Sequence, residues 1–370
     1  MFNGHTFEKV GTDPVGSFDT LSENFLLYLK TAFGTRFPEI EEEREQLLRS
    51  STAFRQEPWL EPIPEYTTTK KTSELTSEDV PGLDEDTLTQ FREIAQCGLV
   101  GDFELYDHQA EMLRKAREGE DVVITAGTGS GKTEAFLMPV LADIVQEAQD
   151  WEAPNDPHPN VNDWWEDNEW RESCKEGGRF KQSFRVPQRD HENRDAALRS
   201  IIVYPMNALV EDQLTRLRAA LDSDAAREWY GDRLDGNRIY FGRYNGNTPV
   251  PGHEWKANGN LNTKKVNRLQ DELKKAGRAA DQAASYADTK RGEEEDRYFF
   301  PRLDGAEMRS RWDMQEAPPD IFITNFSMLS IMLMRDVEHE ILPGTTHASL
   351  QGETNSAQLH LATGWQATTL

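Results

Sequence analysis

The sequence predicts an α/β fold organised around a parallel sheet. Three short apolar runs carry this prediction, because each is rich in Val or Ile and leads into a segment of helical character. They span residues 122–125, 201–204 and 321–324. Apolar residues at nearly every position are typical of strands buried on both faces, as in a parallel sheet covered by helices. The first run leads through a glycine-rich turn into a helix expected over 132–149.

The segments between these runs continue the alternation of helix and strand. Further helices are expected over 83–97, 107–119 and 208–221 and up to Met334, with a short strand over 238–244. The elements from residue 101 onward together predict one domain over residues 101–341, and the helix over 83–97 precedes it.

Residues 1–100 are predicted to form a helical N-terminal extension and a linker. Apolar residues recur at helical spacing from Phe18 to Leu29, and helix formers dominate 38–50. Three prolines in 57–66 exclude a helix there. The polar stretch 67–82 is expected to be a linker or a surface loop.

Two insertions are expected within the domain, at 150–197 and 250–300. The first is acidic and contains four tryptophans, which either anchor the insertion on the body or form a docking patch; they are Trp151, Trp164, Trp165 and Trp170. Within the second, residues 260–296 are charged and helix-prone with few apolar anchors, so a solvent-exposed helix is predicted.

The composition limits the location and the partners. The chain has no run of 18 apolar residues, no secretory signal at its start and two cysteines, so we expect a cytoplasmic protein without membrane or disulfide framework. Its 66 acidic and 41 basic residues give a net charge of −25. Either the acidic surface surrounds a local nucleic-acid groove, or the protein binds no nucleic acid. The motifs below favour the groove.

A phosphate-binding loop is predicted at Ala126–Thr133, which reads AGTGSGKT. Small residues let backbone N–H groups surround phosphates, and a helix begins at the loop's end. Lys132 would contact the β- and γ-phosphates of ATP, and Thr133 would bind Mg²⁺, so both are candidate catalytic residues. The remaining expected nucleotide contacts are Gly127, Thr128, Gly129, Ser130 and Gly131. The alternative is a glycine-rich turn without a ligand.

Segments around this loop resemble motifs of superfamily 2 helicases. LYDHQ at 105–109 is similar to the Q motif, which implies that Gln109 contacts adenine. YPMNALVEDQ at 204–213 is similar to motif Ia, which implies that Asn207 and Gln213 contact a nucleic-acid strand.

Two further segments resemble strand-contacting loops of the same family. FGRYNGNTP at 241–249 is a turn-rich segment after the start of the expected strand. A hairpin or crossover turn without a ligand would have the same sequence pattern. PDIFITNFSML at 319–329 is similar to motifs Ib and Ic. The strand contacts implied by these two segments are Arg243, Asn245, Thr248, Thr324, Asn325 and Ser327.

The combination of GKTEAFLMPVL, YPMNALVEDQ, FPRLDGAEM and ITNFSMLSIMLMR resembles the YprA-like DEAD/DEAH-box helicases, which carry a C-terminal cysteine cluster and include phage-defence helicases of the DISARM type. The resemblance implies a RecA-like lobe that uses ATP and Mg²⁺. It implies DNA as partner, with RNA left open, and protein partners of a defence or DNA-repair system.

Residues 342–370 depart from this pattern. They contain one charged residue, Glu353, and no Asp. The Asp-Glu pair that would hold Mg²⁺ and orient water is therefore missing. We expect a truncated or frame-shifted product that is inactive as a helicase on its own; a genuine short protein is the alternative. The rival functions are an inactive nucleotide-binding remnant and a non-enzymatic interaction module.

Overall fold

A computed structural model describes residues 13–50, 55–56, 59, 66–127, 129–289, 294–335, 338, 341 and 360–363. The chain divides into two compact units, Met1–Glu65 and Tyr66–Leu370. The second unit begins earlier than the predicted boundary at residue 100. The reason is that Leu88, Phe91 and Ile94 are fully buried in its main core, so residues 66–100 pack with the predicted lobe.

The first unit contains two helices, α1 (Pro14–Ala32) and α2 (Pro38–Ser50). The predicted helix over 38–50 is confirmed. Asp13 caps α1 by accepting a hydrogen bond from the Gly16 N–H. Arg49 of α2 pairs with Glu23 and Glu45, and such exposed ion pairs contribute little stability.

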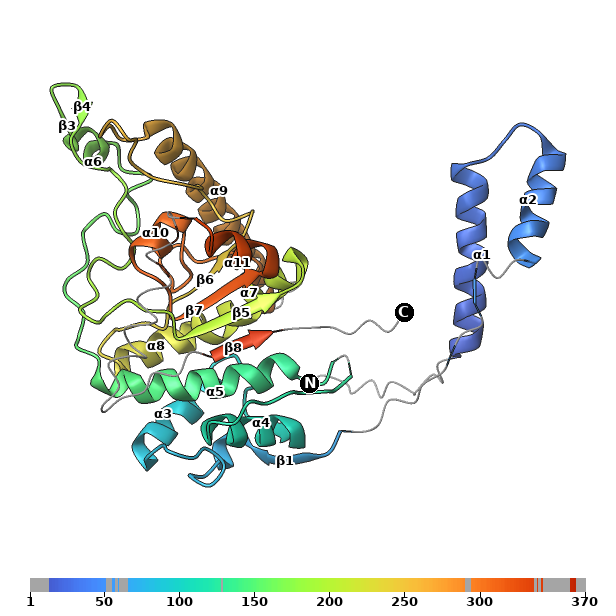
Figure 1. The fold of residues 1–370 in the computed structure, drawn as a ribbon, viewed down its shortest axis with the longest axis horizontal. Coiled ribbons are helices and arrows are strands. Elements are labelled where there is room, and N and C mark those ends of the chain that lie inside the picture. The colour runs from blue at the N-terminus through green and yellow to red at the C-terminus, as the bar shows by residue number, and fades with distance from the viewer. Residues whose placement is uncertain are drawn as a thin grey trace. The chain divides into compact units, whose positions relative to one another are not determined.

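A parallel sheet lies at the centre of the second unit, as predicted (Figure 1). Its strands are β5 (Ser200–Tyr204), β6 (Phe241–Tyr244), β7 (Ile321–Asn325) and β8 (His360–Thr363), in the order β6-β7-β5-β8. Strand β5 is paired residue by residue with β7, from Ser200 opposite Ile321 to Tyr204 opposite Asn325. Every residue of β5 is buried. The fold is therefore an α/β arrangement of the RecA-like type.

Helices complete the layers around the sheet. In Figure 1, α5 (Lys132–Glu147) lies between the sheet and the pair α3 (Glu85–Gln96) and α4 (Asp107–Arg117). Helix α7 (Asn207–Leu221) packs on β5, β6 and β7. The other regular elements are β1 (Thr68–Lys71), β2 (Glu104–Tyr106), β3 (Lys175–Glu176), β4 (Arg179–Phe180), α6 (Asn168–Ser173), α8 (Asp224–Arg233), α9 (Thr263–Ala287), α10 (Arg311–Glu316), α11 (Phe326–Met332), η1 (Thr72–Glu74), η2 (Ala148–Asp150) and η3 (Glu294–Phe299).

The strand predicted over 122–125 is wrong. These residues run without a ladder partner among the described residues, and Val123 is 87 % exposed. In the described sheet β8 is the edge strand, and only β5 pairs with it. An apolar run becomes a strand only where a neighbour satisfies its N–H and C=O groups, and the described chain supplies none for this run.

The two insertions pack together and form a second hydrophobic core. Trp164 and Trp165 are 1 % and 5 % exposed, and they belong to one cluster with Val266, Leu269 and Leu273 of α9. The tryptophans therefore act as anchors, which was one of the two alternatives. The solvent-exposed helix predicted within 260–296 is wrong for the first half of α9, because these apolar residues at helical spacing are buried.

An ion network ties the first insertion to the sheet. The carboxylate of Asp320, directly before β7, accepts hydrogen bonds from Arg194 at 2.7 and 2.8 Å and from Arg199 at 2.8 Å. It also accepts from the backbone N–H of Tyr240 at 2.7 Å. These arginines hold the pKa of the fully buried Asp320 far below its usual range. The network therefore anchors residues 194–199 at the start of β7.

Candidate functional site

The predicted phosphate-binding loop leads from the unpaired segment 121–127 into the first turn of α5. Gly129 and Gly131 have φ angles of 75° and 69°, in the left-handed region where a side chain is strained. No atom lies within 4 Å of the place where a Cβ on Gly129 would stand, so the loop is open on that side. Gly131 is the N-cap of α5. Thr128, another predicted contact, lies outside the described residues.

The side chain of Lys132 turns back onto the loop. Its Nζ donates to the backbone carbonyls of Ala126, at 2.8 Å, and Gly127. The hydroxyl of Ser130 also donates to the Gly127 carbonyl, at 2.8 Å. The ammonium group of Lys132, which we expect to contact phosphates, is therefore held at the loop. The two carbonyl oxygens accept the hydrogen bonds that phosphate oxygens would accept.

Thr133, the predicted Mg²⁺ ligand, contacts a residue from another motif. Its Oγ1 accepts a hydrogen bond from Gln213 Nε2 at 3.2 Å. Gln213 is 4 % exposed, and its Oε1 has no partner among the described residues. The structure thus places Gln213 behind the phosphate loop, away from the surface where the motif Ia resemblance expects a strand contact. Because Gln213 belongs to α7, its hydrogen bond to Thr133 joins that helix to the phosphate loop.

Gln109, the predicted adenine contact, lies directly against the loop. Its Nε2 donates to the Gly131 carbonyl at 2.9 Å, and its Oε1 accepts from the Tyr106 N–H at 2.9 Å. The neighbouring His108 brings Nε2 to 2.7 Å from the Ser130 carbonyl. Because a carbonyl only accepts, Nε2 carries the proton. The adenine contact itself stays a prediction.

The predicted strand contacts gather where β5, β6 and β7 end. Asn325, the last residue of β7, caps α11 by accepting from the Met328 N–H at 2.7 Å. Its Nδ2 donates to Oδ1 of Asn207, the first residue of α7, at 2.6 Å. Asn207 and Ser327 are exposed at this edge. Two helix N-termini therefore lie side by side, an arrangement suited to phosphate oxygens.

Several predicted strand contacts are inside the loops instead. Thr324 is fully buried and donates to the Tyr244 carbonyl at 2.7 Å. Thr248 is 4 % exposed and donates to the Arg243 carbonyl at 2.8 Å. Asn245 is fully buried. The two hydroxyls and Oδ1 of Asn245, which accepts from the Asn247 N–H at 2.9 Å, satisfy nearby backbone, so these three side chains shape the turns. Arg243 is ion-paired with Glu211.

The loop has the donors that the phosphate chain of ATP needs. Backbone N–H groups of the loop, such as that of Gly129 on its open side, are donors from which phosphate oxygens could accept. No cluster of three or more His, Cys, Asp and Glu that could hold a metal occurs among the described residues. Thr133 would hold Mg²⁺ together with phosphate oxygens and water, a type of ligand set that this ion favours.

Comparison with known proteins agrees with this geometry. Residues 106–238 match the DEAD/DEAH box helicase family. The matched segment contains Gln109, the whole phosphate loop, Asn207 and Gln213. No solved structure matches the chain.

The relatives include a bacterial protein and two fungal ones. The chain is 30 % identical to Druantia protein DruE of Escherichia coli over 95 % of its own length, and the match spans 18 % of that protein. ATP-dependent RNA helicase DBP9 of Ajellomyces capsulatus is 54 % identical over 10 % of this chain and 6 % of its own. ATP-dependent RNA helicase DBP4 of Meyerozyma guilliermondii is 38 % identical over 18 % of this chain and 10 % of its own. The chain thus spans a small part of each relative.

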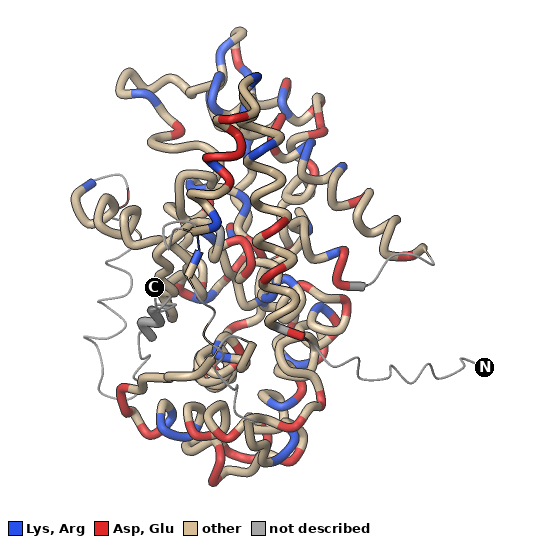
Figure 2. Tube along the Cα trace, turned by 90° about the vertical axis from the view of Figure 1, so that its right-hand side faces the viewer, with Lys and Arg blue, Asp and Glu red and all other residues tan. Residues whose placement is uncertain are grey.

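Part of the basic charge of this acidic chain is buried. Figure 2 shows Lys and Arg interspersed with Asp and Glu along the described trace. Among the described residues seven arginines are buried, namely Arg185, Arg189, Arg194, Arg199, Arg218, Arg309 and Arg311. Buried guanidinium groups cannot displace counterions from a nucleic acid. No helix among the described residues is long and apolar enough to cross a membrane.

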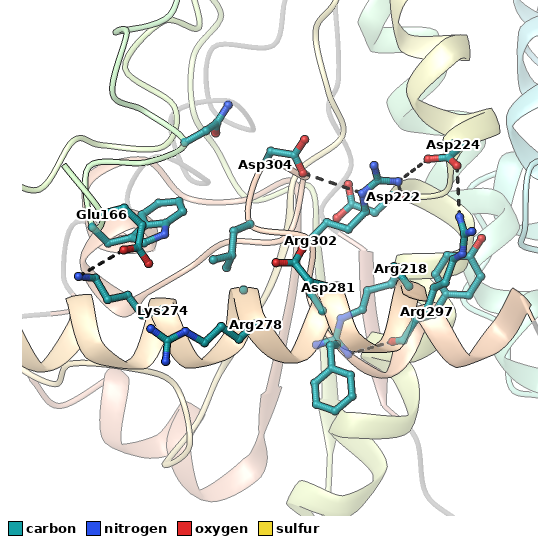
Figure 3. Close-up of a pocket in the computed structure, with 18 residues that line it drawn as sticks. Glu166, Arg218, Asp222, Asp224, Lys274, Arg278, Asp281, Arg297, Arg302 and Asp304 are labelled. Carbon is teal, nitrogen blue, oxygen red and sulfur yellow. Dashed lines mark hydrogen bonds and ion pairs between the residues drawn. The ribbon is translucent and has the colours of Figure 1, made fainter. Parts of the chain in front are cut away.

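A cavity of about 500 Å³ lies apart from the phosphate loop, between α9, η3 and the end of α7 (Figure 3). Arg218, in its lining, is 11 residues after Asn207, or roughly 16 Å along the helix. Much of the charge around the cavity is paired, as in Lys274 with Glu166 and Arg302 with Asp224. The cavity therefore offers no strong field of one sign.

Proposed function

We propose that this chain is the ATP- and nucleic-acid-binding lobe of an ATP-dependent DNA helicase or translocase. One observation carries the proposal. The phosphate loop and the predicted strand-contacting edge are joined through α7, which begins at Asn207 on that edge and holds Thr133 through Gln213. A nucleotide site and a strand site on one helix are what an ATP-driven motor requires.

The nucleotide half of the proposal assigns a role to each loop residue. Lys132 exchanges the carbonyls of Ala126 and Gly127 for the β- and γ-phosphates. The hydroxyl of Thr133 faces Mg²⁺, while Gln213 keeps its oxygen in place by donating to it. Mg²⁺ supplies neutralisation of the negative charge on the phosphates. Gln109, fixed against Gly131, orients toward the adenine side of the site.

The strand half of the proposal rests on the edge formed by α7 and α11. The N–H groups of the two first turns that Asn325 does not cap, with the amides of Asn207 and Asn325 and the hydroxyl of Ser327, bind phosphates of one strand. Such contacts carry no sequence information, so binding is independent of sequence. Arg243 contributes only in part, because Glu211 already neutralises it. We take the bound strand to be DNA, and a comparison with an RNA strand of the same sequence tests this choice.

The place of the whole protein is part of the same proposal. The match spans 18 % of Druantia protein DruE, and the activity of a complete protein belongs to this proposal. Resemblance to the YprA-like group supports a helicase of a phage-defence or DNA-repair system with protein partners. Docking through exposed tryptophans loses its support, since Trp164 and Trp165 are buried.

Binding to a fluorescent 20-nucleotide strand tests the strand half. We expect weak binding of DNA without sequence preference and a log–log salt slope of about −2 to −4, because one lobe supplies few phosphate contacts and the slope scales with their number. Asn325→Ser keeps the helix cap, since Ser is also a good N-cap, but removes the amide, and Asn207→Ala removes its partner. Both variants should weaken binding. Asn258→Ala, at an exposed turn of the second insertion, is the matched control.

Three outcomes decide the strand half. Equal affinity in wild type and both variants would remove the α7–α11 edge as the strand site. Tighter binding of an RNA strand of the same sequence would reassign the substrate. A steep salt slope would point to a basic surface elsewhere.

A further inference from the structure

Three aromatic rings stand beside the phosphate loop. The ring centroids of Tyr66 lie 5.5 Å from Tyr106 and 5.6 Å from His108, and those of Tyr106 and His108 are stacked at 5.6 Å. His108 contacts the far end of the loop at the Ser130 carbonyl. Tyr66 is 43 residues before Gln109. The cluster brings it to the loop.

The hydroxyl of Tyr66 occupies a donor of the loop. The N–H of Gly127 donates to Tyr66 Oη at 2.7 Å. A Cβ built on Gly127 would meet the same oxygen at 2.8 Å, so the hydroxyl fills the space beside this glycine. Gly127 is the first glycine of the phosphate-binding sequence, and its N–H is one of the groups expected to face phosphate oxygens.

Lys132 is engaged at the same end of the loop. Its Nζ donates to the carbonyls of Ala126 and Gly127. The oxygen of Tyr66 and these two carbonyls therefore take the hydrogen bonds that an incoming phosphate would accept. A phosphate can bind there only by replacing them. Lys132 exchanges its carbonyl acceptors for phosphate oxygens and keeps its hydrogen bonds. The Tyr66 oxygen, in contrast, competes with the phosphate for the single N–H of Gly127.

We propose that Tyr66 is a gate of the nucleotide site, whose hydroxyl competes with a nucleotide phosphate for the Gly127 N–H. This inference rests on the proposed ATP site. Nucleotide binding displaces the hydroxyl, and the ring keeps its contacts with Tyr106 and His108 in either state. The apparent affinity for ATP is lower than that of the open loop by the equilibrium constant of the Tyr66–Gly127 hydrogen bond. For a neutral hydrogen bond that factor is about two- to tenfold.

Titration of Mg·ATP into the wild type, Tyr66→Phe and Tyr106→Phe tests the gate. Phenylalanine keeps the ring and removes the competing oxygen, so Tyr66→Phe should bind ATP about two- to tenfold more tightly than the wild type. Tyr106→Phe is the matched control, because it removes a hydroxyl from the same ring cluster, and its affinity should equal that of the wild type.

The outcomes separate the gate from the nucleotide site itself. Equal affinities of the wild type and Tyr66→Phe would overturn the gate and leave the ATP site standing. Weaker binding by Tyr66→Phe would also overturn it, because the hydroxyl would then be a phosphate ligand. Binding by Tyr66→Phe alone would support the gate in its strongest form. Absence of binding in every variant would refute the proposed function, and the gate with it.

A second measurement needs no nucleotide. Gly127→Ala places a methyl group against the Tyr66 oxygen, so it should lower the melting temperature in the wild-type background. In the Tyr66→Phe background the oxygen is gone, and the loss should be smaller. Equal losses in both backgrounds would show that the two residues are not in contact and would contradict the gate.

Discussion

Replacing Asp320 by Asn tests whether a buried ion network holds the first insertion on the sheet. Asp320 is fully buried, and it accepts three hydrogen bonds from arginines and one from the Tyr240 N–H. Asparagine keeps the size of the side chain but removes the charge and one of the two acceptor oxygens. Arg194 and Arg199 then lose their shared counter-charge in a region without water access.

The size of the stability loss depends on which carboxylates still pair with Arg194 and Arg199 after the substitution. Removing one partner of a buried ion pair typically costs about 3–5 kcal/mol. Here Arg194 keeps Glu192, and Arg199 keeps Glu147, so neither guanidinium is left alone. We therefore expect the lower end, a loss of about 3 kcal/mol in the free energy of unfolding at pH 7.

Urea unfolding followed by circular dichroism measures this loss, and its pH dependence identifies the cause. The arginines hold the pKa of Asp320 well below its unfolded value. Below about pH 4 the unfolded chain takes up a proton that the folded chain does not, so this contribution is present at neutral pH and declines as the pH falls. The difference between wild type and Asp320→Asn should shrink from pH 7 to pH 3. A difference that stays constant over this range would refute a charge-based anchor.

Two further predictions concern the second unit. Trp164→Ala should lower the free energy of unfolding by about 3–5 kcal/mol, since a large ring that is 1 % exposed is removed from the second core; an unchanged urea midpoint would mean that the insertions do not pack together. Burial raises the pKa of Asp222 to about 6, above its unfolded value, so ionising it lowers stability as the pH rises from 4 to 6, by up to about 3 kcal/mol. Asp222→Asn should flatten that part of the stability curve, and an identical curve would show that Asp222 is not protonated in the folded state.

The sequence was sufficient for the elements whose signals are local. The apolar runs at 201–204 and 321–324 are strands of a parallel sheet, and the glycine-rich loop leads into α5 at Lys132. Periodicity and composition carry such information, because a buried strand and a helix N-terminus each depend on adjacent residues. The same local signal failed at 122–125, where a strand also needs a neighbour.

Periodicity and composition could not predict contacts between residues that lie far apart in the sequence. Gln213 lies in a segment that resembles a strand-contacting motif, yet it hydrogen-bonds Thr133, 80 residues earlier. Tyr66 lies in a proline-rich stretch without periodicity, yet its hydroxyl reaches Gly127. Spacing along the chain cannot reveal a pairing that only the packing of α4, α5 and α7 creates. The predictions for 342–370 concern residues of which only β8, at 360–363, is described.

The most direct test of the account is a calorimetric titration of Mg·ATP into the wild type and Lys132→Ala. A charge-assisted contact is worth about 1.5–3 kcal/mol, so the variant should bind ATP at least roughly tenfold more weakly than the wild type. Lys275→Ala, which removes an exposed lysine of α9, is the control and should bind like the wild type. Equal ATP affinity in the wild type and Lys132→Ala, or no binding by the wild type, would contradict the assignment of this loop as a nucleotide site.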